Sequence, residues 1–268
     1  KDDERIMMNL PIYQVDAFTD KIFSGNPAAV CPLGQWLDDE ILQKIAMENN
    51  LAETAFYVKE GDRYQIRWFT PEVEVDLCGH ATLASAYVLF NLENHEGNAV
   101  HFFSRRSGEL TVTRDAELLT LNFPVDTIEP IALTDEITNG FDIQPVAAFK
   151  GRTDYLLVYE GEDQISQLTP SFEKISKLKV RGVIVTAKGN EVDFVSRFFA
   201  PQVGVNEDPV TGSAHTTLTP YWAKQLHRNE LSAIQLSSRR GYLKCTLLGD
   251  RVEIRGRAKL YLQGEIFF

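Results

Sequence analysis

The sequence predicts an α+β protein that is built from two related halves. Segments with the character of strands outnumber those with the character of helices. The two kinds do not alternate strictly, as they would in a doubly wound parallel sheet. A nine-residue motif also occurs twice, at a separation close to half of the 268 residues. We therefore expect two pseudo-symmetric lobes with a cleft between them.

The strands are predicted from aromatic and β-branched stretches, several of which alternate apolar and polar residues. In chain order they cover residues 11–18, 28–31, 54–59, 64–69, 109–114, 118–123, 155–159, 182–187, 192–199, 241–247 and 251–256. An amphipathic helix is predicted over 38–49 with Asp38 as its N-cap. Shorter helices are predicted over 135–139 and 171–177, and residues 124–130 are interpreted as a hinge between the lobes.

The internal repeat is the most informative feature. Residues 67–75 read Arg-Trp-Phe-Thr-Pro-Glu-Val-Glu-Val and residues 197–205 read Arg-Phe-Phe-Ala-Pro-Gln-Val-Gly-Val, with five of nine positions identical. Downstream, the segment 78–81 (Cys-Gly-His-Ala) aligns with the segment 211–214 (Thr-Gly-Ser-Ala). This alignment requires three additional residues in the second copy, which we place within 206–210.

In both copies a strand, a turn and a run with helical spacing follow one another. Gly79 and Gly212 stand at the two strand-to-helix junctions, where backbone N–H groups are left free to bind an anion. Each junction alone is somewhat better explained as a tight turn before a buried helix. Their duplication favours a shared site for a carboxylate-bearing metabolite, with the two glycines facing one another.

Composition excludes several classes of protein. Hydrophobic residues make up 44% and charged residues 24% of the chain, which is typical of a globular protein. A net charge of −11 argues against nucleic acid and anionic membranes as partners. Cys31, Cys78 and Cys245 are an odd number without metal-site spacing, so neither a disulfide framework nor a zinc site is expected.

The ends of the sequence and its apolar runs bear on its location. No apolar run reaches the ~20 residues of a membrane span, and the charged first six residues do not resemble a signal peptide. We interpret residues 1–7 as a remnant of cloning and Met8 as the native start. We expect a soluble cytoplasmic protein.

Five segments together resemble the PhzF family of phenazine-biosynthesis-type isomerases and their relatives. They occur in family order and at family spacing, over residues 15–19, 23–30, 50–56, 77–82 and 207–215. The resemblance implies a fold like that of diaminopimelate epimerase, in which each lobe wraps a strongly curved sheet around a central helix. The lobes would span residues 9–124, completed by a C-terminal strand over 259–268, and residues 127–258. It also implies an active site between the lobes, no cofactor, no metal and a homodimer.

The family's general acid/base glutamate falls on Glu53. Independently of that, Glu53 lies in an apolar run (Leu51, Ala52, Ala55, Phe56), where desolvation would raise the pKa of its carboxyl group. The alternative reading of the residues alone is an exposed glutamate at the end of a helix.

His80 and Asp208 also match catalytic positions of the family. A neutral His80 can exchange hydrogen bonds with a substrate, and Asp208 can bind a substrate amine or hydroxyl and balance charge with His80. As isolated residues they would be a structural histidine and a turn aspartate. Gly79, Gly212 and Ser213 are expected to bind substrate through backbone amides and a hydroxyl group.

Three further positions are assigned more simply. Asn26 is expected to line the cleft rather than only fix a turn. His215 is expected to be structural. Arg67 and Arg197 occupy equivalent strands, so each is expected to pair with a carboxylate inside its own lobe.

Two enzymatic mechanisms compete on this scaffold. A two-base epimerase or racemase needs a thiol on each side of the substrate, but Cys78 has Thr211 as its counterpart. We therefore expect an isomerase in which Glu53 alone removes and returns a proton on a small carboxylate. A non-catalytic metabolite-binding protein is the remaining alternative.

Overall fold

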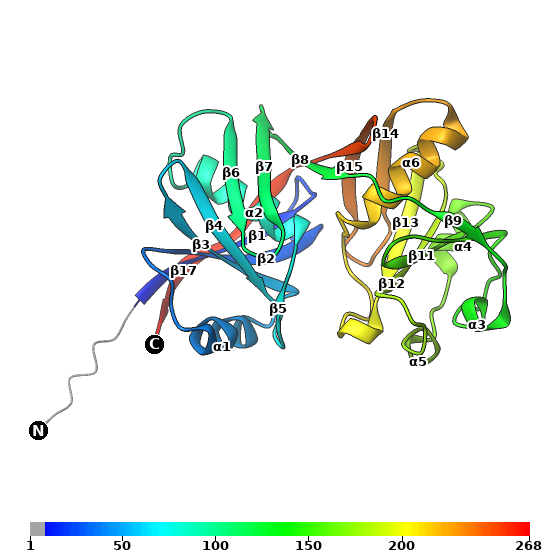
Figure 1. Cartoon of the computed structure of the whole chain (residues 1–268), viewed down its shortest axis with the longest axis horizontal. Coiled ribbons are helices and arrows are strands. Elements are labelled where there is room, and N and C mark those ends of the chain that lie inside the picture. Colours follow the sequence, from blue (N-terminus) through cyan, green and yellow to red (C-terminus); the bar gives the residue numbers. More distant parts are fainter. Residues whose placement is uncertain (1–8) are drawn as a thin grey trace, which may run out of the picture.

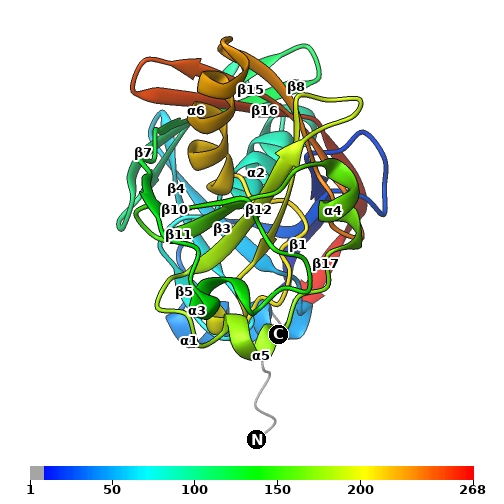
Figure 2. The same ribbon diagram turned by 90° about the vertical axis from the view of Figure 1, so that its right-hand side faces the viewer.

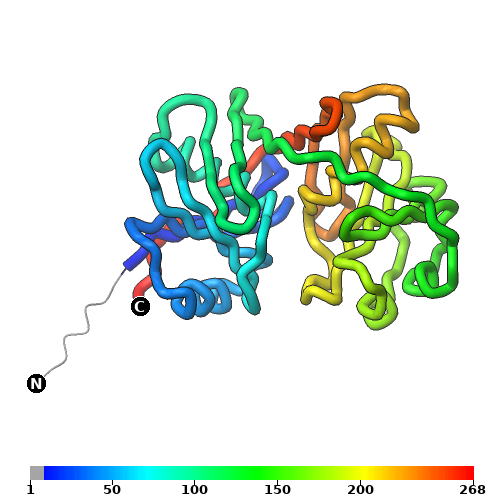
Figure 3. Tube along the Cα trace, viewed as in Figure 1, coloured from blue at the N-terminus to red at the C-terminus, as the bar shows by residue number. Residues whose placement is uncertain are grey.

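The computed structural model describes residues 9–268 as two lobes that lie side by side (Figure 1). The interpretation of residues 1–7 as a cloning remnant, and of Met8 as the start, lies outside the described residues. Within residues 9–268, no helix is long and apolar enough to cross a membrane. The Cα trace shows that the chain enters the second lobe through one connection and returns through another (Figure 3).

The N-terminal lobe wraps a curved sheet around one helix. Its strands are β1 (Asn9–Ala17), β2 (Asn26–Leu33), β3 (Glu53–Glu60), β4 (Arg63–Phe69), β5 (Glu74–Val75), β6 (Ala99–Ser104), β7 (Gly108–Asp115), β8 (Leu118–Pro124) and β17 (Ala258–Phe267). The central helix α2 (Gly79–Asn91) is buried on nearly all sides and contacts β1, β2, β3, β7, β8 and β17. Because most of α2 is buried, apolar and small residues occur on nearly all of its sides, and Asn91 at its end is exposed. Helix α1 (Asp39–Asn49) packs outside the sheet against β3 and β4.

The C-terminal lobe repeats this plan around helix α6 (Ala214–Leu226), which Figure 2 shows from its own side. Its strands are β9 (Glu129–Ile131), β10 (Ala147–Lys150), β11 (Asp154–Val158), β12 (Gly182–Lys188), β13 (Phe194–Phe199), β14 (Glu230–Gln235), β15 (Gly241–Leu248) and β16 (Arg251–Gly256). Three short helices, α3 (Asp135–Thr138), α4 (Glu162–Gln167) and α5 (Phe172–Ile175), and the 3₁₀ turn η1 (Pro201–Val203) complete it. The predicted α+β fold of two pseudo-symmetric lobes is confirmed.

One strand pairing joins the sheets of the two lobes, and a second completes the N-terminal lobe after the chain returns to it. Strand β16 pairs antiparallel with β8, so that the sheets of the two lobes are continuous at this point. The chain then returns as β17, which pairs antiparallel with β1 over Asn9 to Ala17. The first and last described strands are therefore neighbours in one sheet.

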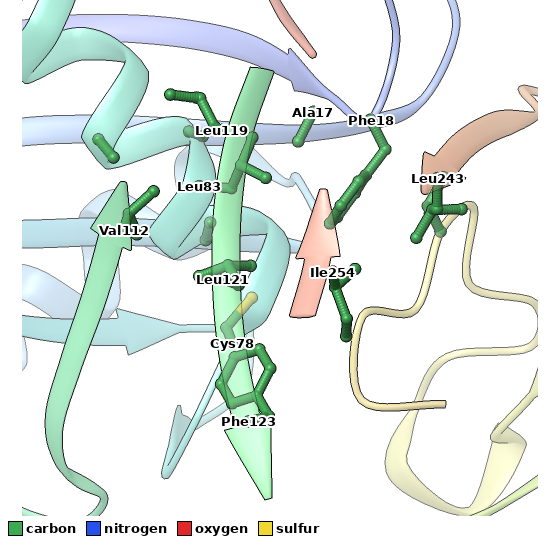
Figure 4. Packing of buried hydrophobic residues seen from close by; sticks show 14 of the residues in the cluster. Ala17, Phe18, Cys78, Leu83, Val112, Leu119, Leu121, Phe123, Leu243 and Ile254 are labelled. Atoms are coloured by element: carbon green, nitrogen blue, oxygen red, sulfur yellow. The ribbon is translucent and has the colours of Figure 1, made fainter. Parts of the chain in front are cut away.

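A single large core runs through both lobes. It includes Leu83 of α2, Leu121 of β8, Ile254 of β16 and Leu243 of β15, which gather around Phe18 between the lobes (Figure 4). Phe18 is fully buried and adopts a left-handed backbone conformation. Burial of such side chains contributes about 25 cal/mol for each Å² of apolar surface, so this core stabilises the relative placement of the lobes.

Two local expectations require correction. Asp38 does precede α1, but its side chain makes no capping hydrogen bond. The segment 124–130 is not a free hinge, because the N–H of Val125 donates to Asp250 O (2.8 Å) and that of Asp126 to Thr216 O (3.2 Å). Thr216 O is available because Pro220, four residues later in α6, has no N–H group.

Candidate active site

The two halves of the internal repeat meet where the lobes meet. A Cβ atom placed on Gly79 would lie 3.8 Å from the Cα of Gly212, and one on Gly212 would lie 3.9 Å from the Cα of Gly79. The expectation that these glycines face one another is confirmed. Neither Cys78, which precedes α2, nor Ser213, which precedes α6, caps its helix with its side chain. The amide groups at both helix starts therefore remain available to a ligand.

Arg67 and Arg197 show how far the symmetry extends. Arg67 forms a bidentate ion pair with Glu74, in which Nε and Nη2 lie 2.8 and 2.9 Å from the two carboxylate oxygens. Arg197 does the same with Glu207, at 2.8 and 2.9 Å. The expected structural pairing within each lobe is confirmed. The sequence alignment placed the three additional residues of the second copy within 206–210. Because Glu207 pairs with Arg197 as Glu74 pairs with Arg67, these three residues instead precede Glu207.

Glu53 begins β3 and contacts the start of α2. Its Oε2 atom lies 3.2 Å from Nε2 of His80, and the glutamate side chain is only 16% exposed. Burial, followed by the negative charge of Asp208, raises the pKa of Glu53 to about 8. Burial lowers the pKa of His80 to about 3, so its imidazole is neutral at physiological pH.

The tautomer of His80 follows from its neighbours. Its Nδ1 atom lies 3.2 Å from the amide nitrogen of Asn26 and 3.4 Å from the thiol of Cys78. The amide nitrogen is only a donor, so a proton on Nδ1 would face another N–H group, whereas the thiol can donate to Nδ1. Nδ1 therefore accepts, and the proton of the neutral ring is on Nε2, facing Glu53.

Asn26 connects the two lobes. This fully buried side chain begins β2, and its Nδ2 atom donates to Asp208 Oδ1 (2.8 Å) and to Val210 O (2.9 Å) in addition to contacting His80. Asp208 and His80, which were expected to balance charge, therefore do not contact one another directly. The Asn26 amide lies between them. Asp208 also accepts from the hydroxyl of Thr211 at 2.5 Å. Burial raises the pKa of Asp208 to about 6 despite these hydrogen bonds.

Two further residues in this region were not predicted from the sequence. Gln235 holds the 208–211 segment, donating from Nε2 to Asp208 O (2.8 Å) and accepting from the N–H of Thr211 (2.8 Å). Arg181 donates from Nη1 to the Ser213 hydroxyl (3.0 Å). Gln235 carried no recognisable signal, whereas Arg181 directly precedes a predicted strand of the second copy. His215 donates from Nδ1 to Thr211 O (2.9 Å), in keeping with a structural role.

Three buried polar atoms in this cluster have no hydrogen-bond partner among the described residues: Asn26 Oδ1, Glu53 Oε2 and His80 Nε2. The Glu53–His80 contact is close but not aligned as a hydrogen bond. Unsatisfied buried groups are costly and need an explanation. Their concentration at one point indicates a place where a polar ligand completes the hydrogen bonding.

Within residues 9–268, one group of side chains has the composition of a metal site. Ligand atoms of Glu53, Cys78 and His80 lie within 4.8 Å of one another. Each already contacts another member, and burial keeps the thiol protonated by raising the pKa of Cys78 well above its usual value. A metal ion would therefore have to displace a proton from the thiol and break the contacts of His80.

A cavity of about 390 Å³ lies elsewhere, on the face of β1 and β17. It is lined mostly by apolar and amide side chains, including Ile12, Leu51 and Leu262, and Glu265 is its one ionisable residue. It contains none of the clustered acid/base groups, so we place the candidate active site at Glu53, His80 and Asp208.

The architecture defines a class of two-lobed proteins with an epimerase-like fold. A hydroxyproline epimerase of Agrobacterium vitis superposes with a TM-score of 0.64 over 97% of this chain and 93% of its own, at 9% sequence identity, which is a likeness of fold alone. Within this class the chain belongs to the family described as phenazine biosynthesis-like protein, whose profile matches residues 15–264.

Relatives are similar over almost their whole length. An uncharacterized isomerase of Pseudomonas aeruginosa is 52% identical over 97% of this chain and 99% of its own. One of Halalkalibacterium halodurans is 46% identical over the same shares. The crystal structure of a PhzF-family protein of Enterococcus faecalis has a TM-score of 0.95 and 48% identity, covering 97% of this chain and 100% of that one.

Proposed function

We propose that this protein is a cofactor-independent isomerase that moves a proton on a small carboxylate-bearing metabolite, with Glu53 as its single acid/base. The observation that supports this most strongly is the raised pKa of Glu53, about 8, beside a neutral His80 and unsatisfied polar atoms. A carboxyl group that titrates near neutral pH both accepts and returns a proton efficiently. The names of the relatives as isomerases support the reaction class.

The strand register supports a single base. In the first lobe Thr54 pairs with Phe69, and in the second Val183 pairs with Phe199, the repeat equivalent of Phe69. The counterpart of Glu53 is therefore Gly182, which has no side chain. A Cβ atom there would lie 2.4 Å from the ring of Phe198, so the second lobe has no room for an acid at this position.

A symmetric pair of thiols is also absent from the equivalent positions. Cys78 has Thr211 as its counterpart, and the Thr211 hydroxyl donates to Asp208. Burial raises the pKa of Cys78, which keeps the thiol protonated and therefore unavailable as a base. Removal of a proton from one face and its return to the other, as in a two-base epimerase, is therefore disfavoured.

The mechanism follows from these positions. Glu53 in its ionised form removes a proton from carbon, and the electron pair moves into the unsaturated system conjugated with the substrate carboxylate. His80 Nε2–H and the amide groups at the two helix starts stabilise the developing negative charge. The protonated Glu53 then returns the proton to another carbon on the same face. Asp208, held by Asn26 and Thr211, orients a polar group of the substrate.

The test is proton exchange followed by ¹H NMR in D₂O, with a panel of β,γ-unsaturated carboxylic acids. Wild type is expected to incorporate deuterium or shift the double bond. Glu53→Gln should be slower by roughly 10²- to 10⁴-fold, the usual contribution of general acid–base catalysis. Cys78→Ala should retain most activity, and Asp208→Asn should fall between them. An inactive Cys78→Ala beside an active Glu53→Gln would refute the one-base mechanism.

A further inference from the structure

The two lobes place different charges at equivalent positions of the repeat. The register that matches Glu53 with Gly182 also matches Ala52 with Arg181, the preceding residue. The first lobe thus presents a carboxyl group at the site, and the second presents a guanidinium group one residue away. Both groups lie at the start of equivalent strands, β3 and β12.

Arg181 is held rigidly by its own lobe. Its Nε atom donates to Asp154 Oδ1 at 2.9 Å and its Nη2 atom donates to Asp154 Oδ2. The guanidinium also lies over the ring of Phe198, 5.3 Å from the centroid. An arginine that is fixed by a carboxylate on one edge loses little conformational entropy when its other edge binds a ligand.

The free edge of Arg181 faces the site. Nη1 donates to the Ser213 hydroxyl at 3.0 Å, next to Gly212 and the start of α6. A guanidinium has five N–H groups, and within residues 9–268 two of those of Arg181 have no partner. The arginine side chain is 36% exposed, whereas Asp154 is 3% exposed, so ligand can reach the cation but not its counter-ion.

The other charges near Arg181 are acidic. Asp208 and Asp126 both act on it from neighbouring segments, in addition to Asp154. Asp126 is engaged elsewhere, accepting from the Arg152 N–H and the Thr217 hydroxyl. Arg181 therefore supplies the positive charge in an otherwise acidic part of the second lobe's side of the site.

We infer that Arg181 and the Ser213 hydroxyl bind the carboxylate of the substrate and so determine specificity for an anion. This inference rests on the proposed function of Glu53. When Glu53 removes the proton, the electron pair of the C–H bond delocalises into the carboxylate. Glu53 then returns the proton to a second carbon, where the delocalised pair forms the new C–H bond. Arg181 stabilises the added charge, because charge-assisted hydrogen bonds to a carboxylate are among the strongest in proteins. No oxidant or other reactant takes part.

The inference is tested by binding of benzoate, with neutral benzamide as its matched analogue, measured by ligand-observed NMR. Wild type should bind benzoate more tightly than benzamide. Arg181→Gln should weaken benzoate binding at least tenfold and leave benzamide unchanged, while Arg181→Lys should have an intermediate affinity. If the unpaired Asp154 prevents folding of Arg181→Gln, the double variant Asp154→Asn/Arg181→Gln removes both charges.

Arg63→Gln is the control, because Arg63 also pairs with a carboxylate, Glu60, and lies over an aromatic ring, Phe103. It should bind benzoate as wild type does. Glu53→Gln should keep benzoate binding while losing proton exchange, which separates the two proposals. Absence of benzoate binding by wild type, or equal binding by Arg181→Gln, would overturn the inference even if Glu53 proves to be the base.

Discussion

Replacing Glu53 by glutamine should make the folded protein more stable, and increasingly so as the pH rises. Glu53 is buried beside Asp208, so its ionised form is unfavourable in the folded state. Glutamine keeps the shape of the side chain and carries no charge. The residue proposed to perform the chemistry is thus one that weakens the fold under working conditions.

The size and sign of the effect follow from the pKa of Glu53. The carboxyl group titrates near 4.5 in the unfolded chain and near 8 in the folded protein. Between these values the folded state retains a proton that the unfolded state has released, so the free energy of unfolding falls as the pH rises. One pKa unit corresponds to about 1.4 kcal/mol, which makes the full difference about 5 kcal/mol. Glutamine lacks this contribution.

The assay is thermal unfolding of wild type and Glu53→Gln from pH 5 to 9. About 4 kcal/mol of this difference develops between pH 5 and 9, because the unfolded chain is already partly ionised at pH 5. For a chain of this size, 1 kcal/mol shifts Tm by roughly 2 °C, so the gap between the two proteins should widen by about 8 °C over this range. Glu96→Gln, at an exposed position, is the control and should unfold in parallel with wild type. Parallel curves for Glu53→Gln and wild type would show that Glu53 is ionised in the folded protein and would refute the reasoning.

Two further predictions concern neighbouring positions. ¹⁵N NMR should show His80 as the neutral Nε2–H tautomer from pH 5 to 9, because burial lowers its pKa to about 3; a titration near 6.5 would contradict the geometry. Gly182→Ala should reduce stability by about 1–3 kcal/mol through overpacking, since its Cβ would lie 2.4 Å from Phe198, while Gly34→Ala, with no atom within 4 Å, should be neutral. Denaturant unfolding measures the stability of both variants. A Gly182→Ala variant as stable as Gly34→Ala would show that Phe198 moves aside freely.

Much of the fold could be predicted because the repeat and the strand patterns are local signals. The strands over 118–123 and 251–256 alternate clearly, and the structure has them as β8 and β16. Strands β6 and β14 were missed, since His101 and Ser232 interrupt their apolar character and their partners in the sheet decide their conformation. Helix α2 was expected from the helical spacing of its apolar residues after the repeat, although its outer side is also largely buried.

The site residues were predictable mainly from the family resemblance, which the repeat supports at His80 and at the segment that follows Val205. The structure brings Glu53, His80, Asn26 and Asp208 together, although Asn26 and Asp208 are 182 positions apart in the chain. No local pattern could show that the Asn26 amide separates Asp208 from His80, because this depends on how the lobes pack. Arg181 was overlooked for a similar reason, since its equivalence to Ala52 appears only once the strand registers are known.

The pairing of β1 with β17 has a consequence for synthesis of the protein. Strand β1 is made before the other described strands, yet its antiparallel partner spans residues 258–267. On the ribosome, the N-terminal lobe must therefore wait, with one edge of its sheet uncovered, until this distant segment has been translated. Contacts between residues so distant in sequence slow folding and expose strand edges to aggregation. We expect the second lobe, whose strands β9 to β16 are contiguous in sequence, to acquire its structure while the first is still incomplete.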